Sequence, residues 1–172
     1  MADAYARISN RVGIVTAQNG PAATLLVAPL AEALKASVPV IALVQEVALT
    51  GTDRNAFQEL DHLKLFEGCA KWIRRIDHVS RVEDMVDMAF AAATTGRPGP
   101  AVLLVPADLL NAAMPEIEMR GAVMGQVPLD RVAPDPARVT EAAGLLAEAR
   151  APLIIAGGGV HMSGAHEALA RL

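Results

Sequence analysis

Short apolar runs alternate along this chain with amphipathic stretches, a pattern that predicts strands and helices in turn. Residues 12–16 form an apolar, β-branched run of the kind that fills a buried strand. A polar turn, Gln-Asn-Gly-Pro at residues 18–21, follows it, and a helix to about Ser37 comes next. Residues 40–44 repeat the buried-strand pattern. A strand, helix and strand of this length predict a right-handed crossover in a parallel sheet.

The polar turn at residues 18–21 falls at the carboxyl end of the first predicted strand. Pro21 suits the first turn of a helix, and Asn19 or Gly20 can cap that helix. Parallel sheets bind ligands at the carboxyl ends of their strands, so this turn is the first place where we expect a site. Pro29 falls inside the helix and is expected to kink it or to free a carbonyl group.

Three further segments extend the alternation. Residues 56–66 predict a short helix, with Phe57, Leu60 and Leu63 on or near one apolar face. Residues 70–76 predict a strand nearer the sheet edge, and residues 101–105 predict another buried strand. Together with the first unit, these segments predict an α/β fold: a parallel sheet with flanking helices.

A clear amphipathic helix is predicted at residues 82–94, between the last two strands. Ser80 is its expected cap, and Glu83 three residues later would complete a capping box. Gly96 is expected to end it.

The periodicity disappears at residues 111–136, where several prolines favour an extended linker. A helix at 137–150 and a strand at 152–156 follow. One strand cannot enclose a core. We therefore expect a domain at 1–110, then the linker, then only the beginning of a second α/β domain at 137–172. The chain starts inside a helical segment with no preceding strand, so the first domain is also expected to be truncated at its amino end.

Composition and charge exclude several classes of protein. The chain is 53% hydrophobic and 20% charged, so it has enough to bury and is not a disordered chain. The net charge is −4, and the densest basic patch, around Arg74 and Arg75, reads more simply as a solvated strand edge than as a nucleic-acid surface. The uncharged segment 12–31 is broken by the polar turn, so no membrane span is expected.

Cysteine usage and the start of the chain indicate a compartment. The single cysteine, Cys69, leaves no internal disulfide and no cysteine-based zinc site. Asp3 and Arg7 interrupt the first residues, which are unlike a signal peptide. A reducing cytoplasm is therefore the expected location.

Four blocks stand out in order along the chain: MADAYAR at 1–7, QNGPAAT at 18–24, FQELD at 57–61 and TGRPGPAVLLVPADLL at 95–110. Together they resemble the amino-terminal half of thiamine-diphosphate-dependent enzymes of the acetolactate synthase type. The resemblance covers roughly 1–110 and implies the pyrimidine-binding domain of that family, with the thiamine-diphosphate-binding fold. The linker and APLIIAGGGV at 151–160 resemble the start of the family's central domain.

The resemblance also implies a chemistry. In the family, the cofactor's thiazolium carbon loses a proton and adds to a 2-keto acid; carbon dioxide leaves, and the remaining fragment passes to an acceptor. A glutamate on the pyrimidine ring activates the cofactor, and a third domain holds magnesium and the diphosphate. Neither is matched in this sequence. We therefore expect no catalytic residue and no metal ligand here, and a chain that is inactive by itself; whether it counts as an enzyme stays open.

The family's site residues carry over to two short blocks. The resemblance implies cofactor contacts from Gly20, Pro21 and Gln58, and a substrate pocket that includes Gln18, Asn19 and Phe57. Each has a simpler structural alternative: Gly20-Pro21 can be only a helix start, Gln18 and Asn19 can cap local backbone, and Gln58 can lie on a helix surface. Leu25 stands where the family has an asparagine, so an amide contact near the pyrimidine is lost or the subfamily differs.

Other polar residues carry weaker signals. Glu59 is more simply a solvated helix residue than a general base. The four histidines show no metal-like cluster, and His62, near Gln58, is a faint candidate for a substrate contact. The glycines at 157–159 fail the dinucleotide fingerprint; in the resembling family this loop lies against FAD where FAD is used, although a tight turn is the simpler interpretation.

The function that these signals favour is thiamine diphosphate binding, as part of an acetolactate synthase-like transferase or lyase acting on 2-keto acids. The family's active site lies between two subunits, so a homo-oligomer is expected in the complete protein. The alternative is a non-catalytic binding or regulatory module that pairs with a full-length homologue. A generic nucleotide binder is disfavoured because its glycine fingerprint is missing.

Overall fold

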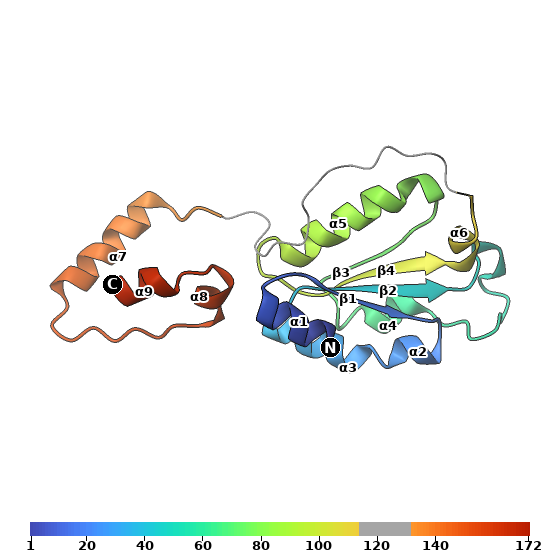
Figure 1. Cartoon of the computed structure of the whole chain (residues 1–172), viewed down its shortest axis with the longest axis horizontal. Helices are drawn as coiled ribbons and strands as arrows, with labels where there is room; N and C mark the ends of the chain where they lie inside the picture. Colours follow the sequence, from blue (N-terminus) through green and yellow to red (C-terminus); the bar gives the residue numbers. More distant parts are fainter. Residues whose placement is uncertain (114–131) are drawn as a thin grey trace. The chain divides into compact units, whose positions relative to one another are not determined.

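A computed structural model describes residues 1–113 and 132–172 (Figure 1). The chain divides into two units, Met1–Leu129 and Asp130–Leu172, and each is described by itself. Within the described residues, the first unit holds one four-stranded sheet in the order β1-β2-β4-β3, and every pair of neighbours is parallel. Its strands are β1 Gly13–Ala17, β2 Val40–Glu46, β3 Trp72–Arg75 and β4 Ala101–Pro106. The predicted α/β fold with a parallel sheet is confirmed.

Helices cover both faces of this sheet (Figure 1). They are α1 Ala2–Ser9, α2 Pro21–Thr24, α3 Val27–Ala36, α4 His62–Phe66, α5 Val82–Thr94 and α6 Ala107–Leu110, with two 3₁₀ turns, η1 Leu49–Gly51 and η2 Val79–Arg81. On one face α1 to α4 pack against the sheet, and on the other α5 does so.

The central strands β2 and β4 are buried on both faces, as a covered parallel sheet requires. Alternate residues divide between two cores: Ala42 and Val44 pack toward α3 and α4, whereas Ile41 packs toward α5. Alanines on the helices, such as Ala33 and Ala89, are fully buried at these contacts. Small side chains therefore let the helices lie close on the sheet.

The helix expected between the first two strands is interrupted. It is split into α2 and α3 by the residues Leu25 and Leu26. Pro29 is the third residue of α3, where its missing N–H falls among the groups that have no partner within a helix. Pro29 therefore does not kink a continuous helix; a new helix begins two residues before it. The helix ends at Ala36, and Ser37 follows in the left-handed conformation (φ 59°).

The helix predicted at 56–66 is wrong in its first half. The chain runs in turns until Asp61, whose carboxylate accepts a hydrogen bond from the backbone N–H of Lys64 and caps α4. Gln58 has a φ of 59°, which no helix tolerates. The expected apolar face is consequently not buried, and Phe57 is 83% exposed.

The capping box expected for α5 is also wrong, although the bounds of this helix, Val82–Thr94, are as predicted. The N-cap is Arg81, and Ser80 lies one residue too early, inside η2. The Nδ1 atom of His78 accepts from the backbone N–H of Ser80, so an imidazole caps a 3₁₀ turn that leads into the helix.

The second unit contains three helices in its described part: α7 Pro136–Glu148, α8 Gly158–Met162 and α9 His166–Arg171. The helix predicted from 137 is confirmed, with Asp135 as its cap. The strand predicted at 152–156 is wrong, because the described part of this unit offers no second strand to pair with it. The expected glycine turn is instead the start of α8. Most of the predicted linker lies outside the described residues, and the domain boundaries stay a prediction.

Among the described helices, none is long and apolar enough to cross a membrane.

Candidate functional site

The turn at residues 18–21 leaves the carboxyl end of β1 and enters α2, as predicted. Gly20 is the N-cap of α2 and has a φ of 61°, a conformation that L side chains rarely adopt. Pro21 is the first residue of the helix. The turn thus places backbone, rather than side chains, at the sheet edge where parallel sheets bind ligands.

The loop at residues 57–62 holds this turn from a distance in the sequence. The amide nitrogen of Asn19 donates to the backbone carbonyl oxygens of Phe57 (3.1 Å) and Gln58 (3.3 Å). Asn19 is only 6% exposed. A Cβ on Gly20 would stand 2.5 Å from the Gln58 carbonyl oxygen, so only glycine fits this approach. The Asn19 amide nitrogen is therefore committed to backbone of a loop distant in sequence, and not to the local backbone that the sequence alternative proposed.

The three residues predicted to contact the cofactor border one cavity of about 460 Å³. Gly20, Pro21 and Gln58 line it together with Thr24, Glu59 and Leu60. The Oε1 atom of Gln58 is buried and has no hydrogen-bond partner among the described residues. An unpaired buried acceptor is costly, so this oxygen is suited to accept a hydrogen bond from a ligand.

Gln18 faces a different cavity, of about 480 Å³. That cavity is lined by residues from the ends of the three strands β1, β2 and β4 and from α6: Thr16, Ala17, Gln18, Leu43, Gln45, Val105 and Leu110. Phe57, the remaining residue of the predicted substrate pocket, is exposed and is not among the residues that line either cavity. The structure therefore does not gather Gln18, Asn19 and Phe57 around one space.

A buried chain of polar groups runs beneath the turn. The backbone N–H of Gly20 donates to Nε2 of His62 at 3.0 Å, and Nδ1 of His62 lies 3.3 Å from Oε1 of Glu46. The side chain of His62 is 1% exposed and that of Glu46 is 5% exposed. His62 is therefore buried and engaged at both nitrogens, which corrects its tentative assignment as a substrate contact.

Arg75 is the last member of this row of hydrogen-bonded polar groups. Its Nη2 donates to Oε1 of Glu46 at 3.0 Å, and its Nε pairs with Oε2 of the same carboxylate. The interpretation of Arg75 as part of a merely solvated strand edge is thus wrong. Sequence reasoning missed Glu46 altogether; the one available signal was a carboxylate at the end of a strand otherwise buried on both faces.

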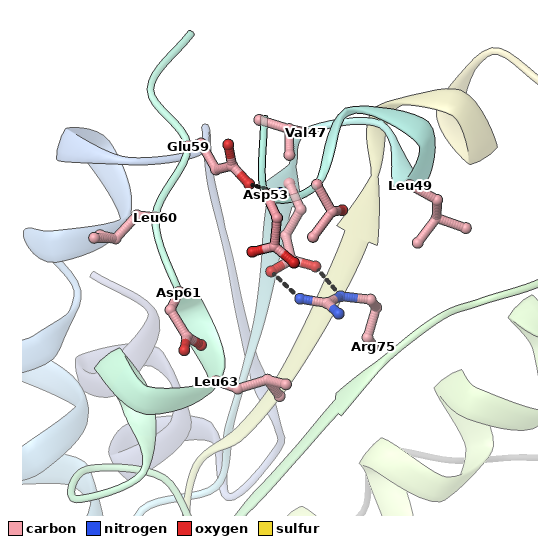
Figure 2. Close-up of a pocket in the computed structure, with 10 residues that line it drawn as sticks. Val47, Leu49, Asp53, Glu59, Leu60, Asp61, Leu63 and Arg75 are labelled. Carbon is pink, nitrogen blue, oxygen red and sulfur yellow. Dashed lines mark hydrogen bonds and ion pairs between the residues drawn. The ribbon is translucent and has the colours of Figure 1, made fainter. Parts of the chain in front are cut away.

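Arg75 also borders a third cavity, of about 240 Å³, shown in Figure 2. Its lining includes the carboxylates of Glu46, Asp53, Glu59 and Asp61. Burial raises the pKa of Glu46, but hydrogen bonds from His62 and Arg75 and the arginine's charge outweigh it, so the pKa is held below its usual value.

Glu59 serves the loop rather than solvent. Its carboxylate accepts hydrogen bonds from the backbone N–H groups of Asp53 (2.6 Å) and Ala56 (2.9 Å). These bonds lower the pKa of Glu59. The expectation that Glu59 lies in a helix is wrong, since Glu59 instead gives the turns at 53–59 the hydrogen bonds that a helix would have supplied.

Taken together, the site offers a glycine-edged cavity, a free amide oxygen and a rigid polar support. Within the described ranges, 1–113 and 132–172, no three His, Cys, Asp or Glu side chains come together in a way that could hold a metal ion. The arrangement can bind a flat ring that carries N–H donors.

Comparison with known proteins finds a family model that matches the first 65 residues and relatives that align with nearly the whole chain. Residues 1–65 match a family described as "Thiamine pyrophosphate enzyme, N-terminal TPP binding domain". A probable acetolactate synthase large subunit from Methanocaldococcus jannaschii is 39% identical over 99% of this chain, and an acetolactate synthase from Arthrospira platensis is 37% identical over 99%. A sulfoacetaldehyde acetyltransferase from Castellaniella defragrans is 36% identical over 97%. The chain spans 29%, 30% and 27% of these relatives, respectively.

Proposed function

We propose that this chain, which corresponds to the amino-terminal TPP-binding part of a thiamine pyrophosphate enzyme of the acetolactate synthase type, forms the pyrimidine side of a thiamine diphosphate site. The observation that carries the proposal is the cavity beside Gly20 and Pro21, which is also lined by Gln58, a residue whose buried amide oxygen has no partner among the described residues. The cofactor, when bound, would supply a nucleophilic carbon and an electron sink for the decarboxylation or ligation of 2-keto acids.

The residues present fit the aminopyrimidine ring. Its exocyclic amine is a hydrogen-bond donor, and Oε1 of Gln58 is an acceptor without a donor. Pro21 and Leu60 add apolar surface to the same cavity, on which the ring can lie. In this assignment Gln58 orients the ring, and Gly20 and Pro21 form the wall against which it lies.

The proton chemistry is proposed to depend on groups that this chain does not supply. Glu59 is the carboxylate in the cavity lining, but its oxygens are occupied by the backbone N–H groups of Asp53 and Ala56. We therefore propose that the activating acid and the magnesium ion come from other parts of a longer protein, and that the 172 residues alone do not turn over substrate. We also propose that the complete protein is a homo-oligomer in the cytoplasm and that it has a place for FAD.

Calorimetric titration of thiamine diphosphate with magnesium tests the proposal. Gln58→Leu removes the acceptor oxygen at nearly unchanged size and is expected to weaken binding about three- to tenfold, the usual effect of one hydrogen bond. Gln45→Leu, in the neighbouring cavity, is the matched control and should bind as the wild type does. Equal affinities for the two variants would contradict the assignment of Gln58.

A second titration separates the enzyme fragment from the alternative, a non-catalytic module that pairs with a full-length homologue. The same chain is titrated after mixing with such a homologue. Heat that appears only in the mixture would favour the pairing module. No heat in either sample would contradict thiamine diphosphate binding by this chain.

A further inference from the structure

We propose that His62 is a positioning residue. Its imidazole, with the hydrogen on Nδ1, fixes the Gly20 amide and thereby the wall of the cavity beside Gly20 and Pro21. This inference rests on the proposed function for its meaning, because the wall is the one assigned to thiamine diphosphate. It assigns a role to a residue that contacts no ligand itself.

The direction of each hydrogen bond follows from the donors involved. A backbone N–H can only donate, so Nε2 of His62, 3.0 Å from the Gly20 nitrogen, must offer a lone pair. The other nitrogen, Nδ1, then carries the hydrogen and donates to the Glu46 carboxylate at 3.3 Å. A hydrogen on Nε2 would oppose the Gly20 N–H and remove the bond.

Glu46 and Arg75 select this form of the ring. Glu46 carries a carboxylate that can only accept, so it favours the hydrogen on the nitrogen that faces it. Arg75 pairs with both oxygens of the same carboxylate and keeps it charged in a buried position. The ion pair between Glu46 and Arg75 thus influences the turn at 18–21 through the His62 imidazole. Hydrogen bonds from Arg75 through Glu46 and His62 to Gly20 link the lining of the cavity beside Arg75 to that of the cavity beside Gly20.

The Gly20 amide has a particular need for this acceptor. As the N-cap of α2, Gly20 stands where the chain turns, with a φ of 61°, and its N–H is buried against His62. Gln58 approaches Gly20 from the loop, and Asn19 is tied to the same loop. His62, at the end of this loop and the start of α4, adds a third contact by accepting from the Gly20 N–H. Without the acceptor, a buried N–H would be left unpaired at the very edge of the cavity.

Two variants separate the two halves of the imidazole. In glutamine the amide oxygen is as many bonds from Cβ as Nε2 is in histidine, and in asparagine the amide nitrogen matches Nδ1. His62→Gln can therefore still accept from Gly20, whereas His62→Asn can still donate to Glu46 but not reach Gly20. Both lose the aromatic ring and its stacking on Phe66. Asparagine is one methylene shorter than glutamine, so the exchange of the Gly20 amide is compared with that of the other amides of the first unit, which a general packing loss affects as well.

The experiment measures two quantities on the full 172-residue chain and both variants: hydrogen exchange of the Gly20 amide by NMR, and the affinity for thiamine diphosphate with magnesium by calorimetry. We expect Gly20 protection and affinity near the wild-type values in His62→Gln. In His62→Asn we expect exchange at least tenfold faster and binding about tenfold weaker, the usual scale of one buried bond. Equal behaviour of the two variants would overturn the inference.

The two proposals fail in different ways. Absence of binding by the wild-type chain contradicts the proposed function, and the Gly20 exchange rates then still decide the role of His62. If neither variant folds, the ¹⁵N shifts of His62 in the wild type decide it. An unprotonated Nε2 supports the inference, and a protonated Nε2 overturns it.

Discussion

Replacing Gly20 by alanine tests how tightly the turn at 18–21 is held by the loop beside it. The new Cβ would lie 2.5 Å from the carbonyl oxygen and 2.9 Å from the Cβ of Gln58. Neither contact is with the flexible end of a side chain, so the backbone itself must shift. The φ of 61° is a second source of strain for any residue with a Cβ.

Backbone strain and the contact with Gln58 both contribute to the loss of stability. Gly20 has a φ of 61° and a ψ of −122°, a combination that residues with a Cβ avoid, and forcing such a residue into it costs about 1–3 kcal/mol. Inserting a methyl group into a space that has no room for it costs about 1–3 kcal/mol more. We therefore expect Gly20→Ala to lower the free energy of unfolding of the first unit by about 2–6 kcal/mol, a large part of the stability of an ordinary domain.

Gly96→Ala is the matched control. Gly96 has a φ of 60°, but a Cβ there would meet nothing within 4 Å. It should show only the conformational term, about 1–2 kcal/mol. Both glycines have a φ near 60°, so a larger loss in Gly20→Ala reports the contact with Gln58 together with the strain of the Gly20 ψ of −122°.

Urea unfolding followed by the fluorescence of Trp72 is a suitable assay. Trp72 is the chain's single tryptophan and lies in β3 of the first unit, so its signal reports on that unit. The midpoint and slope of each transition give the free energies. Equal losses in Gly20→Ala and Gly96→Ala would refute the argument that the loop presses on the turn.

Three further predictions concern buried groups. Arg75→Met leaves the Glu46 carboxylate without its ion-pair partner and should cost about 3 kcal/mol in urea unfolding, against less than about 1 kcal/mol for the exposed Arg81→Met control; similar losses would show that the buried pair has no special weight. The pKa of Glu46 is lowered in the fold from 4.5, despite the opposing effect of burial, by bonds from His62 and Arg75. Its stabilisation is present above that value and is lost as the pH falls through the folded pKa, so the free energy of unfolding should fall more steeply below about pH 5 in the wild type than in Glu46→Gln, and parallel curves would contradict this. Burial raises the pKa of the Cys69 thiol, so a disulfide reagent should label it slowly in the native chain and rapidly in urea; fast native labelling would show that the core around Cys69 opens readily.

The sheet and its large helices could be predicted from sequence because they depend on periodic burial. Residues 101–105 and 82–94 carry patterns that only a two-sided strand and an amphipathic helix explain, and both were confirmed almost to the residue. The polar turn after β1 was also predictable, since glycine and proline fix local geometry without help from distant residues.

The loop at 57–62 could not be predicted in the same way. Its apolar residues are spaced as in a helix, but its conformation is fixed by Glu59 and Asp61, which bind backbone N–H groups nearby. The contact of Asn19 with Phe57 spans 38 residues of sequence. The pairing of His62 with Glu46 depends on how α4 lies against β2. Such contacts form only when distant segments pack together, so no local sequence pattern predicts them.

The dependence of the turn on a distant loop has a practical consequence for protein engineering. Residues 18–21 are too short to keep their shape when moved alone, because Asn19 and Gly20 are held by 57–62. An exchange of this turn between related enzymes should therefore carry both segments as one cassette. A chimera that moves only one segment would combine a turn from one protein with a loop from another, and the contacts between them would not match. Libraries that diversify the cavity should likewise vary the two segments together.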